Sequence, residues 1–255
     1  MLMGVPAASA LASAKVRLAN ARPGSHAIGL KVIVGGAAPP TIGEASFGQV
    51  TPYANVAAGS ASVALSGLQP GDGNPGQATQ QLVDGDRYTA VALAKGSKGF
   101  EVRVYHDGSA RSGTARLRVL HAAPELGSPN VRLGQRTIAE KVVFRDATPY
   151  LSVTPGSYAL AVVRPGGTAP IFEKQIAVSA GTASTAILAG SGGARERVIL
   201  ATDDTKTPVG PPETGLGGLA GGDGPPWLLV ALAALLAGAL GGVTQLSLAR
   251  RSGRR

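Results

Sequence analysis

The chain repeats itself at domain length, and this repeat limits its possible folds more than any other feature. Residues 16–23 align with 117–124, 47–53 with 144–150, 85–91 with 181–187 and 101–104 with 197–200, at offsets of 101, 97, 96 and 96 residues. A solenoid repeats every ~20–50 residues, so a unit of this length is predicted to be a domain in itself. We therefore expect two successive domains, at residues 15–110 and 115–204.

Both copies carry the pattern of short β-strands. Apolar and β-branched runs alternate with Gly, Pro, Asn and Asp at 16–21, 28–34, 61–68, 88–94 and 100–105, and at 117–122, 137–144, 157–163, 172–178, 182–188 and 197–201. Residues 101–105 and 116–120 alternate with period two, which predicts one face toward a core and one toward water. No helical stripe lasts three turns between 15 and 204. The predicted fold is all-β, with two tandem antiparallel β-sandwich (immunoglobulin-like) domains of six or seven strands each.

A Thr-Pro-Tyr motif occurs in both copies and ends at Tyr53 and Tyr150. Proline has no amide donor and keeps the preceding residue extended, so it is expected at a strand start or edge. Each tyrosine is predicted to bury its ring and to need one partner for its hydroxyl. His121 stands where the first copy has Asn20, and it is predicted to be a buried, hydrogen-bonding turn residue rather than a base or a ligand.

The motif Leu117–Pro124, followed by Phe144 and the segment Thr148–Tyr158, resembles bacterial domain-of-unknown-function family 4397. The resemblance covers nearly all of 15–204. It implies an exported protein with tandem β domains, a Gly-rich stretch and a single membrane helix, and it supplies no activity. Three features depart from the family pattern: Glu125 replaces the usual Asp, residues 130–133 replace a Val-Asp-Val-Tyr-like strand, and the first copy has Asn20 in place of the histidine.

The C-terminal region predicts a membrane anchor. Trp227 to Leu248 contains no charge, and as a helix its 22 residues span roughly 33 Å, enough for a ~30 Å hydrocarbon core. The arginines that follow mark the cytoplasmic side, and Trp227 suits the outer interface. They are Arg250, Arg251, Arg254 and Arg255. The predicted order is a Pro/Gly-rich linker at 205–226, a transmembrane α-helix at 227–248 and a basic cytoplasmic tail at 249–255, with the N-terminus outside.

The N-terminal residues 1–14 are apolar and small, and Ala12-Ser13-Ala14 suits a signal peptidase. No basic residue precedes this stretch. The favoured interpretation is the remnant of a signal peptide, with the mature chain beginning near Lys15. The alternative is a disordered, Ala-rich N-terminus.

One short segment resembles a sorting signal. Pro212, Glu213, Thr214 and Gly215 follow the Leu-Pro-x-Thr-Gly pattern that sortases cut between Thr and Gly, with Pro211 in place of leucine. A hydrophobic span and a basic tail follow in the expected order. Cleavage would leave the protein on the cell wall. The alternative is a plain Pro/Gly linker that lifts the domains off the membrane.

The search for reactive groups predicts no catalytic, cofactor-binding or metal-binding residue. The chain has no cysteine, and its formal net charge of +9 includes the four tail arginines. Its other basic residues are scattered, which argues against nucleic acid. Gly71–Gly76 has the spacing of a dinucleotide loop, but Pro75 blocks the helix that such a loop opens. Residues 84–86 are expected to form a hairpin turn rather than a calcium site. His26, His106 and His121 are dispersed.

These observations predict a surface-anchored, non-enzymatic structural or binding module of the bacterial cell envelope. The expected partners are the membrane and either a cell-wall polymer or another surface protein. The alternative is an enzyme that acts on envelope polysaccharide. Such an enzyme would need two carboxylates ~5–10 Å apart in a cleft.

Overall fold

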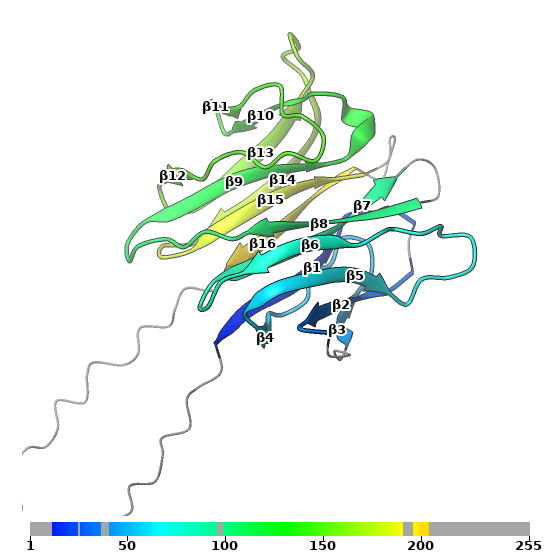
Figure 1. Ribbon diagram of the computed structural model, residues 1–255. Helices are drawn as coiled ribbons and strands as arrows, with labels where there is room; N and C mark the ends of the chain where they lie inside the picture. Colours follow the sequence, from blue (N-terminus) through cyan, green and yellow to red (C-terminus); the bar gives the residue numbers. More distant parts are fainter. Residues whose placement is uncertain (1–11, 25, 37–40, 96–98, 191–195, 204–255) are drawn as a thin grey trace, which may run out of the picture. The chain divides into compact units, whose positions relative to one another are not determined.

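The computed structural model describes residues 12–24, 26–36, 41–95, 99–190 and 196–203, and these residues are all-β (Figure 1). They form sixteen strands and one short 3₁₀ helix, η1 (Pro124–Leu126). Both sequence repeats lie in one compact unit within Met1–Thr207. The prediction of an all-β fold is confirmed for the described residues.

The first repeat is a sandwich of two four-stranded sheets. One sheet has the order β4-β1-β7-β8 and the other β3-β2-β5-β6. The strands are β1 (Ser13–Asn20), β2 (Ile28–Val34), β3 (Thr41–Ala45), β4 (Ala54–Ala57), β5 (Gly59–Ser66), β6 (Ala78–Leu82), β7 (Arg87–Lys95) and β8 (Gly99–His106). Side chains from both sheets, including Leu18, Leu30 and Phe100, meet in one buried core.

The second repeat has the same architecture, with sheet orders β12-β9-β15-β16 and β11-β10-β13-β14. Its strands are β9 (Ala115–Ala122), β10 (Asn130–Leu133), β11 (Arg136–Ala139), β12 (Leu151–Val153), β13 (Gly156–Val163), β14 (Pro170–Val178), β15 (Ala183–Ala189) and β16 (Arg197–Asp203). Leu117, Leu160 and Leu188 belong to its separate core. Each repeat therefore has eight described strands, and the predicted strand at 137–144 ends at Ala139.

The prediction of purely antiparallel sheets is wrong at one pair in each repeat. β1 runs parallel to β7, with Val16 opposite Tyr88, and β9 runs parallel to β15, with Leu117 opposite Ser184. The remaining strand pairs in the described residues are antiparallel. A parallel pair needs a long crossover connection, and here the strands of the second sheet supply it.

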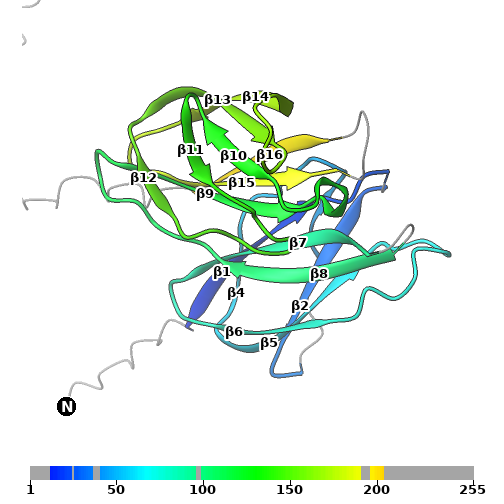
Figure 2. The same ribbon diagram turned by 90° about the horizontal axis from the view of Figure 1, so that it is seen from above.

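In the sheets that contain β1 and β9, the central strands β1, β7, β9 and β15 are largely buried on both faces. These two sheets face each other (Figure 2), and a third hydrophobic core joins them across the repeats. It contains Ala19, Ala21, Val91, Leu93, Leu120, Ala122, Ile187, Ala189, Ile199 and Ala201. Every residue of β15 is buried. The prediction that the polar face of residues 116–120 meets water is therefore wrong, because the other repeat covers that face.

One turn and one boundary differ in detail from their predictions. Residues 84–86 form a turn in which Gly85 has φ +77°. They connect β6 in one sheet to β7 in the other, so they are not a hairpin. Gly71–Gly76 lies between β5 and β6 and contains no helix, as predicted. β1 begins at Ser13, and Ala14 is fully buried in the core, so the domain starts two residues earlier than expected.

The sorting motif at 212–215, Trp227 and the four terminal arginines lie outside the described residues. Among the residues that the structure does describe, no helix has the length and apolar character needed to span a membrane.

Candidate functional site

Among the described residues, four charged side chains are buried, and all four lie where the repeats meet. Arg17, Asp107, Arg118 and Asp203 are 3%, 4%, 6% and 1% exposed, respectively. Burial of an unpaired ion costs several kcal/mol, so buried charges are found paired and hydrogen-bonded. Here the charges bond to one another and to four hydroxyl groups. The inter-repeat cluster consists of Arg17, Tyr53, Thr89, Asp107, Arg118, Tyr150, Thr185 and Asp203.

Strand alternation places both arginines in this cluster. On β1, Val16 and Leu18 point into the core of the first repeat, so Arg17 between them projects from the opposite face. On β9, Leu117 and Val119 do the same in the second repeat, and Arg118 projects toward the first. The aspartates come from strand ends, since Asp203 is the last residue of β16 and Asp107 directly follows β8.

The two arginines make matching bonds. The Nε of each donates to a threonine Oγ1 of its own repeat at 2.9 Å, Arg17 to Thr89 and Arg118 to Thr185. Nη1 donates to a carbonyl oxygen of the other repeat at 2.7 Å, that of Thr202 for Arg17 and that of His106 for Arg118.

Nη2 of each arginine then reaches an aspartate of the other repeat. Arg118 donates to Asp107 Oδ1 at 2.8 Å, and Arg17 donates to Asp203 Oδ1. Equivalent residues thus bond equivalent partners across the repeats, so the cluster has pseudo-twofold symmetry, as in an isologous dimer interface.

The tyrosines of the Thr-Pro-Tyr motifs complete the cluster. Tyr53 contacts Asp107 Oδ2 at 2.7 Å and Asp203 Oδ1 at 2.9 Å through its hydroxyl. The hydroxyl of Tyr150 contacts Asp203 Oδ2 at 3.1 Å and accepts a bond from Gly108 N at 3.1 Å. Arg17 stacks over the ring of Tyr53 at 4.3 Å, and Arg118 over that of Tyr150 at 4.6 Å. The prediction that each ring is buried in a core is only partly met, because both rings are half-buried in the polar cluster, outside the three hydrophobic cores, and each hydroxyl has more partners than the one expected.

Burial alters the proton affinities of the cluster. It raises the pKa of Asp203 to about 6, with a further contribution from the negative charge of Asp107, while Arg17 opposes the rise. Burial also raises the pKa of Tyr150 to about 12 and raises that of Tyr53. Both phenols therefore stay protonated at neutral pH and donate hydrogen bonds to the carboxylates.

The enzyme alternative needs two carboxylates that converge and that a polymer can reach, and the cluster meets only the first of these requirements. Asp107 and Asp203 converge on one hydroxyl, so these carboxylates are not dispersed. However, their side chains are 0% and 1% exposed, and each is paired with an arginine. A polymer cannot reach them in this arrangement.

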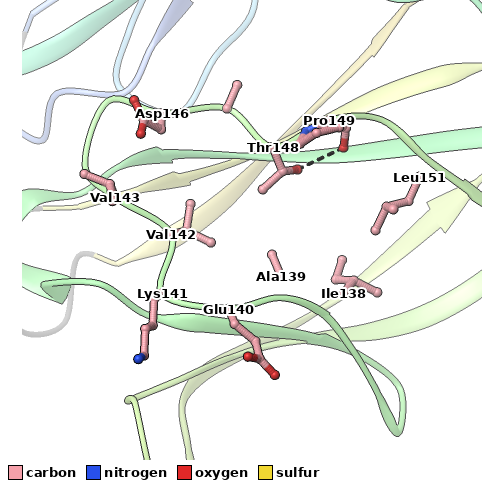
Figure 3. A pocket seen from close by; sticks show the side chains of 11 residues that line it. Ile138, Ala139, Glu140, Lys141, Val142, Val143, Asp146, Thr148, Pro149 and Leu151 are labelled. Carbon is pink, nitrogen blue, oxygen red and sulfur yellow. Dashed lines mark hydrogen bonds between the residues drawn. The ribbon is translucent and has the colours of Figure 1, made fainter.

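Two surface pockets lie elsewhere. The first, of about 390 Å³, is lined mainly by the segment from Ile138 to Leu151, and Figure 3 shows Glu140 and Asp146 at opposite sides of it. The second, of about 360 Å³, runs between β6 and β8, and its one carboxylate belongs to Glu101. Glu101 Oε1 accepts a bond from Arg103 at 2.7 Å.

The histidines lie apart, as the sequence indicates. His121 is fully buried on β9, which confirms its burial but places it in a strand rather than a turn. Its Nδ1 accepts a bond from Ala123 N at 3.3 Å, so the proton sits on Nε2, which lies 2.8 Å from the Gly127 carbonyl oxygen. Burial lowers its pKa. His26 bonds Gly67 O at 2.7 Å, and His106 lies 3.1 Å from Asp86.

No group of three or more His, Cys, Asp or Glu side chains in the described part of the chain could hold a metal ion.

The sequence pattern does not predict the inter-repeat cluster. A signal was present, because Arg17 recurs as Arg118 and Asp107 recurs as Asp203 at the same offsets as the aligned segments.

The fold and cluster define a class, namely tandem β-sandwich repeats joined face to face by a duplicated set of buried ion pairs. The family model described as "Domain of unknown function (DUF4397)" matches residues 14–132 and 115–214. These segments cover well over half of the chain, which therefore belongs to this family, and their overlap is consistent with tandem copies. No curated protein matches the chain.

Proposed function

We propose that this protein is a non-enzymatic structural or binding module of the bacterial cell envelope, in which the two repeats act as one rigid unit. The observation that carries the proposal is the use of the buried charges. All four buried charged side chains of the described residues serve to join the repeats. None is left free for chemistry on a substrate.

The interface between the two repeats is suited to holding them rigidly. Interfaces between independently moving domains are usually small and polar, whereas this one adds an apolar core to its ion pairs. Any sliding would separate arginine from aspartate and leave a buried charge without its partner, which costs about 3–5 kcal/mol. A stiff two-repeat unit suits a spacer or a display platform at a surface.

The finer features of the proposal come from the sequence. They are an immunoglobulin-like character for each sandwich, a cleaved leader that ends before β1 at Ser13, and a transmembrane helix at Trp227–Leu248 with the basic tail inside. The uncharged span and the four arginines support this orientation. The Pro/Gly-rich linker at 205–226 would hold the unit away from the membrane.

Sortase processing is the alternative for the anchor. The intact mass of the native protein, taken after cell fractionation, tests it. We expect a membrane species that ends at Arg255. A species that ends at Thr214 and carries wall fragments would replace the membrane anchor with a covalent wall linkage.

The enzyme alternative is tested on envelope polysaccharide. The purified full chain, incubated with isolated wall polymer, is expected to release no new reducing ends. Release that disappears in the Glu140→Gln or Asp146→Asn variant would overturn the non-enzymatic proposal, because these carboxylates line the first pocket.

A further inference from the structure

The hydroxyl of Tyr53 faces two carboxylates with a single proton. It lies 2.7 Å from Asp107 Oδ2 and 2.9 Å from Asp203 Oδ1. One O–H can donate well to only one acceptor. With both aspartates ionised, one of these short contacts therefore joins an oxygen lone pair to a carboxylate oxygen. This is the point where the pseudo-twofold symmetry of the cluster breaks.

The other donors do not remove this mismatch. Asp107 also accepts from Thr89 Oγ1 at 2.6 Å and from Arg118 at 2.8 Å. Asp203 also accepts from Arg17, while its Oδ2 lies 3.1 Å from the hydroxyl of Tyr150. When Tyr53 donates to Asp107, Asp203 therefore has two donors where Asp107 has three.

The charges around the triad are few and come from several elements. β1 supplies Arg17 and β9 supplies Arg118, each bonded to an aspartate of the cluster. Arg87 at the start of β7 and Arg116 on β9 stand beside the tyrosine rings, at 5.9 Å from Tyr53 and 5.1 Å from Tyr150. β15 contributes only hydroxyl groups, and the side chain of His106 is more than half exposed and pairs with Asp86.

The triad can bind one extra proton. On Asp203 Oδ1 it is donated to the hydroxyl oxygen of Tyr53, while Tyr53 donates its own proton to Asp107 Oδ2, so that both short contacts become hydrogen bonds. Two like charges this close disfavour double ionisation, and a carboxylate pair that shares one proton is a known solution.

We propose that the Asp107–Tyr53–Asp203 triad takes up one proton in mild acid while the repeats stay docked, so that the joint between the repeats is more stable in mild acid than at neutral pH. This goes beyond the proposed function, since it gives the rigid unit a pH response. It does not require the unit to be an envelope protein.

The difference between the folded and unfolded pKa of Asp203 sets the direction in which stability changes with pH. The pKa of Asp203 is raised to about 6 in the folded unit, above the ~3.9 of an exposed aspartate. Its protonation therefore adds stability as the pH falls through 6, and that stability is lost again as the pH rises. His121 acts in the opposite direction because its pKa is lowered by burial.

The experiment isolates Asp203. The full chain, kept in mild detergent, carries His121→Asn, which copies Asn20 of the first repeat, and is compared with the same chain carrying Asp203→Asn. Urea unfolding is followed by circular dichroism at pH 7 and pH 5. The unfolding constant of the Asp203→Asn chain, divided by that of the chain that keeps Asp203, should be roughly tenfold larger at pH 5 than at pH 7. An unchanged ratio would overturn the proposal.

A direct titration covers the case in which Asp203→Asn fails to fold. Carbon-13 NMR of the aspartate carboxyl groups in the folded chain should show one group that titrates near pH 6. If all carboxyl groups titrate at pH 4 or below, the triad holds no proton. Neither outcome depends on membrane location or polymer binding, so failure here is distinguishable from failure of the proposed function.

Discussion

Arg118 Nη2 donates to Asp107 Oδ1 at 2.8 Å, and this bond runs from the second repeat back to the first. Arg17 and Asp203 make the same bond in the reverse direction. Each repeat thus supplies one cation and one anion to the buried joint, and each of these charges meets its hydrogen-bonded counter-charge only when the two repeats are docked.

Removing one partner should therefore be costly. Arg118→Met leaves Asp107 buried without its hydrogen-bonded cation and with only Arg17 at 3.9 Å, and we expect the free energy of unfolding to fall by about 3–5 kcal/mol. Denaturant titration followed by circular dichroism measures this loss. Arg136→Met, at an exposed arginine on β11, is the matched control and should change stability by less than about 0.5 kcal/mol. Equal small effects in both variants would contradict a role for the pair.

Removing both partners should cost less than the single changes predict. In a double-mutant cycle of Arg17→Met and Asp203→Leu, each single variant leaves one buried charge without its hydrogen-bonded partner, whereas the double variant removes both charges of the pair. We expect a coupling free energy of about 1–3 kcal/mol. Additive losses would mean that these two side chains do not interact in solution.

Tyr53→Phe tests the bridging hydroxyl. The carboxylate pair loses the one proton that this hydroxyl donates, so the doubly ionised pair becomes less favourable and the pKa of Asp203 should rise above about 6. Tyr150→Phe leaves the bridge between the two carboxylates in place and is the comparison. Carboxyl NMR titrations of the two variants measure the shifts, and a fall in the Asp203 pKa in Tyr53→Phe would be inconsistent with the bonding described.

His121→Asn should reduce the loss of folding stability as the pH falls into the acid range. The folded unit keeps His121 neutral, since burial lowers its pKa and Ala123 N donates to its Nδ1. The unfolded chain binds a proton below about pH 6.5, so this residue removes stability as the pH falls through that value. Melting temperatures at pH 7.5 and 5.5 check this. Unless the variant loses less stability in acid than the parent chain, the histidine is not held neutral.

The sequence pattern located the core strands well and their environment less well. β2 was predicted with its observed bounds, Ile28–Val34, because a long apolar run with turn residues at both ends is unambiguous. The edge strands β4 and β12, of four and three residues, are too short to produce a period-two signal. The parallel pairing of β1 with β7 joins segments about seventy residues apart, and a local pattern carries no information on that pairing.

The cluster illustrates the same limit. Alternation distinguishes the polar face of β9 from its apolar face, but it cannot say what covers the polar face. The alternation therefore predicts that Arg118 is exposed to solvent, although it is 6% exposed. The recurrence of Arg17 as Arg118 and of Asp107 as Asp203 is visible in the sequence, yet their contact depends on how the two repeats dock, which a single sequence does not reveal.

The most direct test of the account is a distance measurement between the repeats. The chain has no cysteine, so Val83→Cys and Val143→Cys, at positions 51% and 55% exposed in the first and second repeats, provide two unique spin-labelling sites. Double electron–electron resonance on the full chain should give one narrow distance distribution, which broadens when Arg118→Met is added. A broad distribution in the parent chain would show that the repeats move independently, and it would contradict a rigid unit held by the inter-repeat cluster.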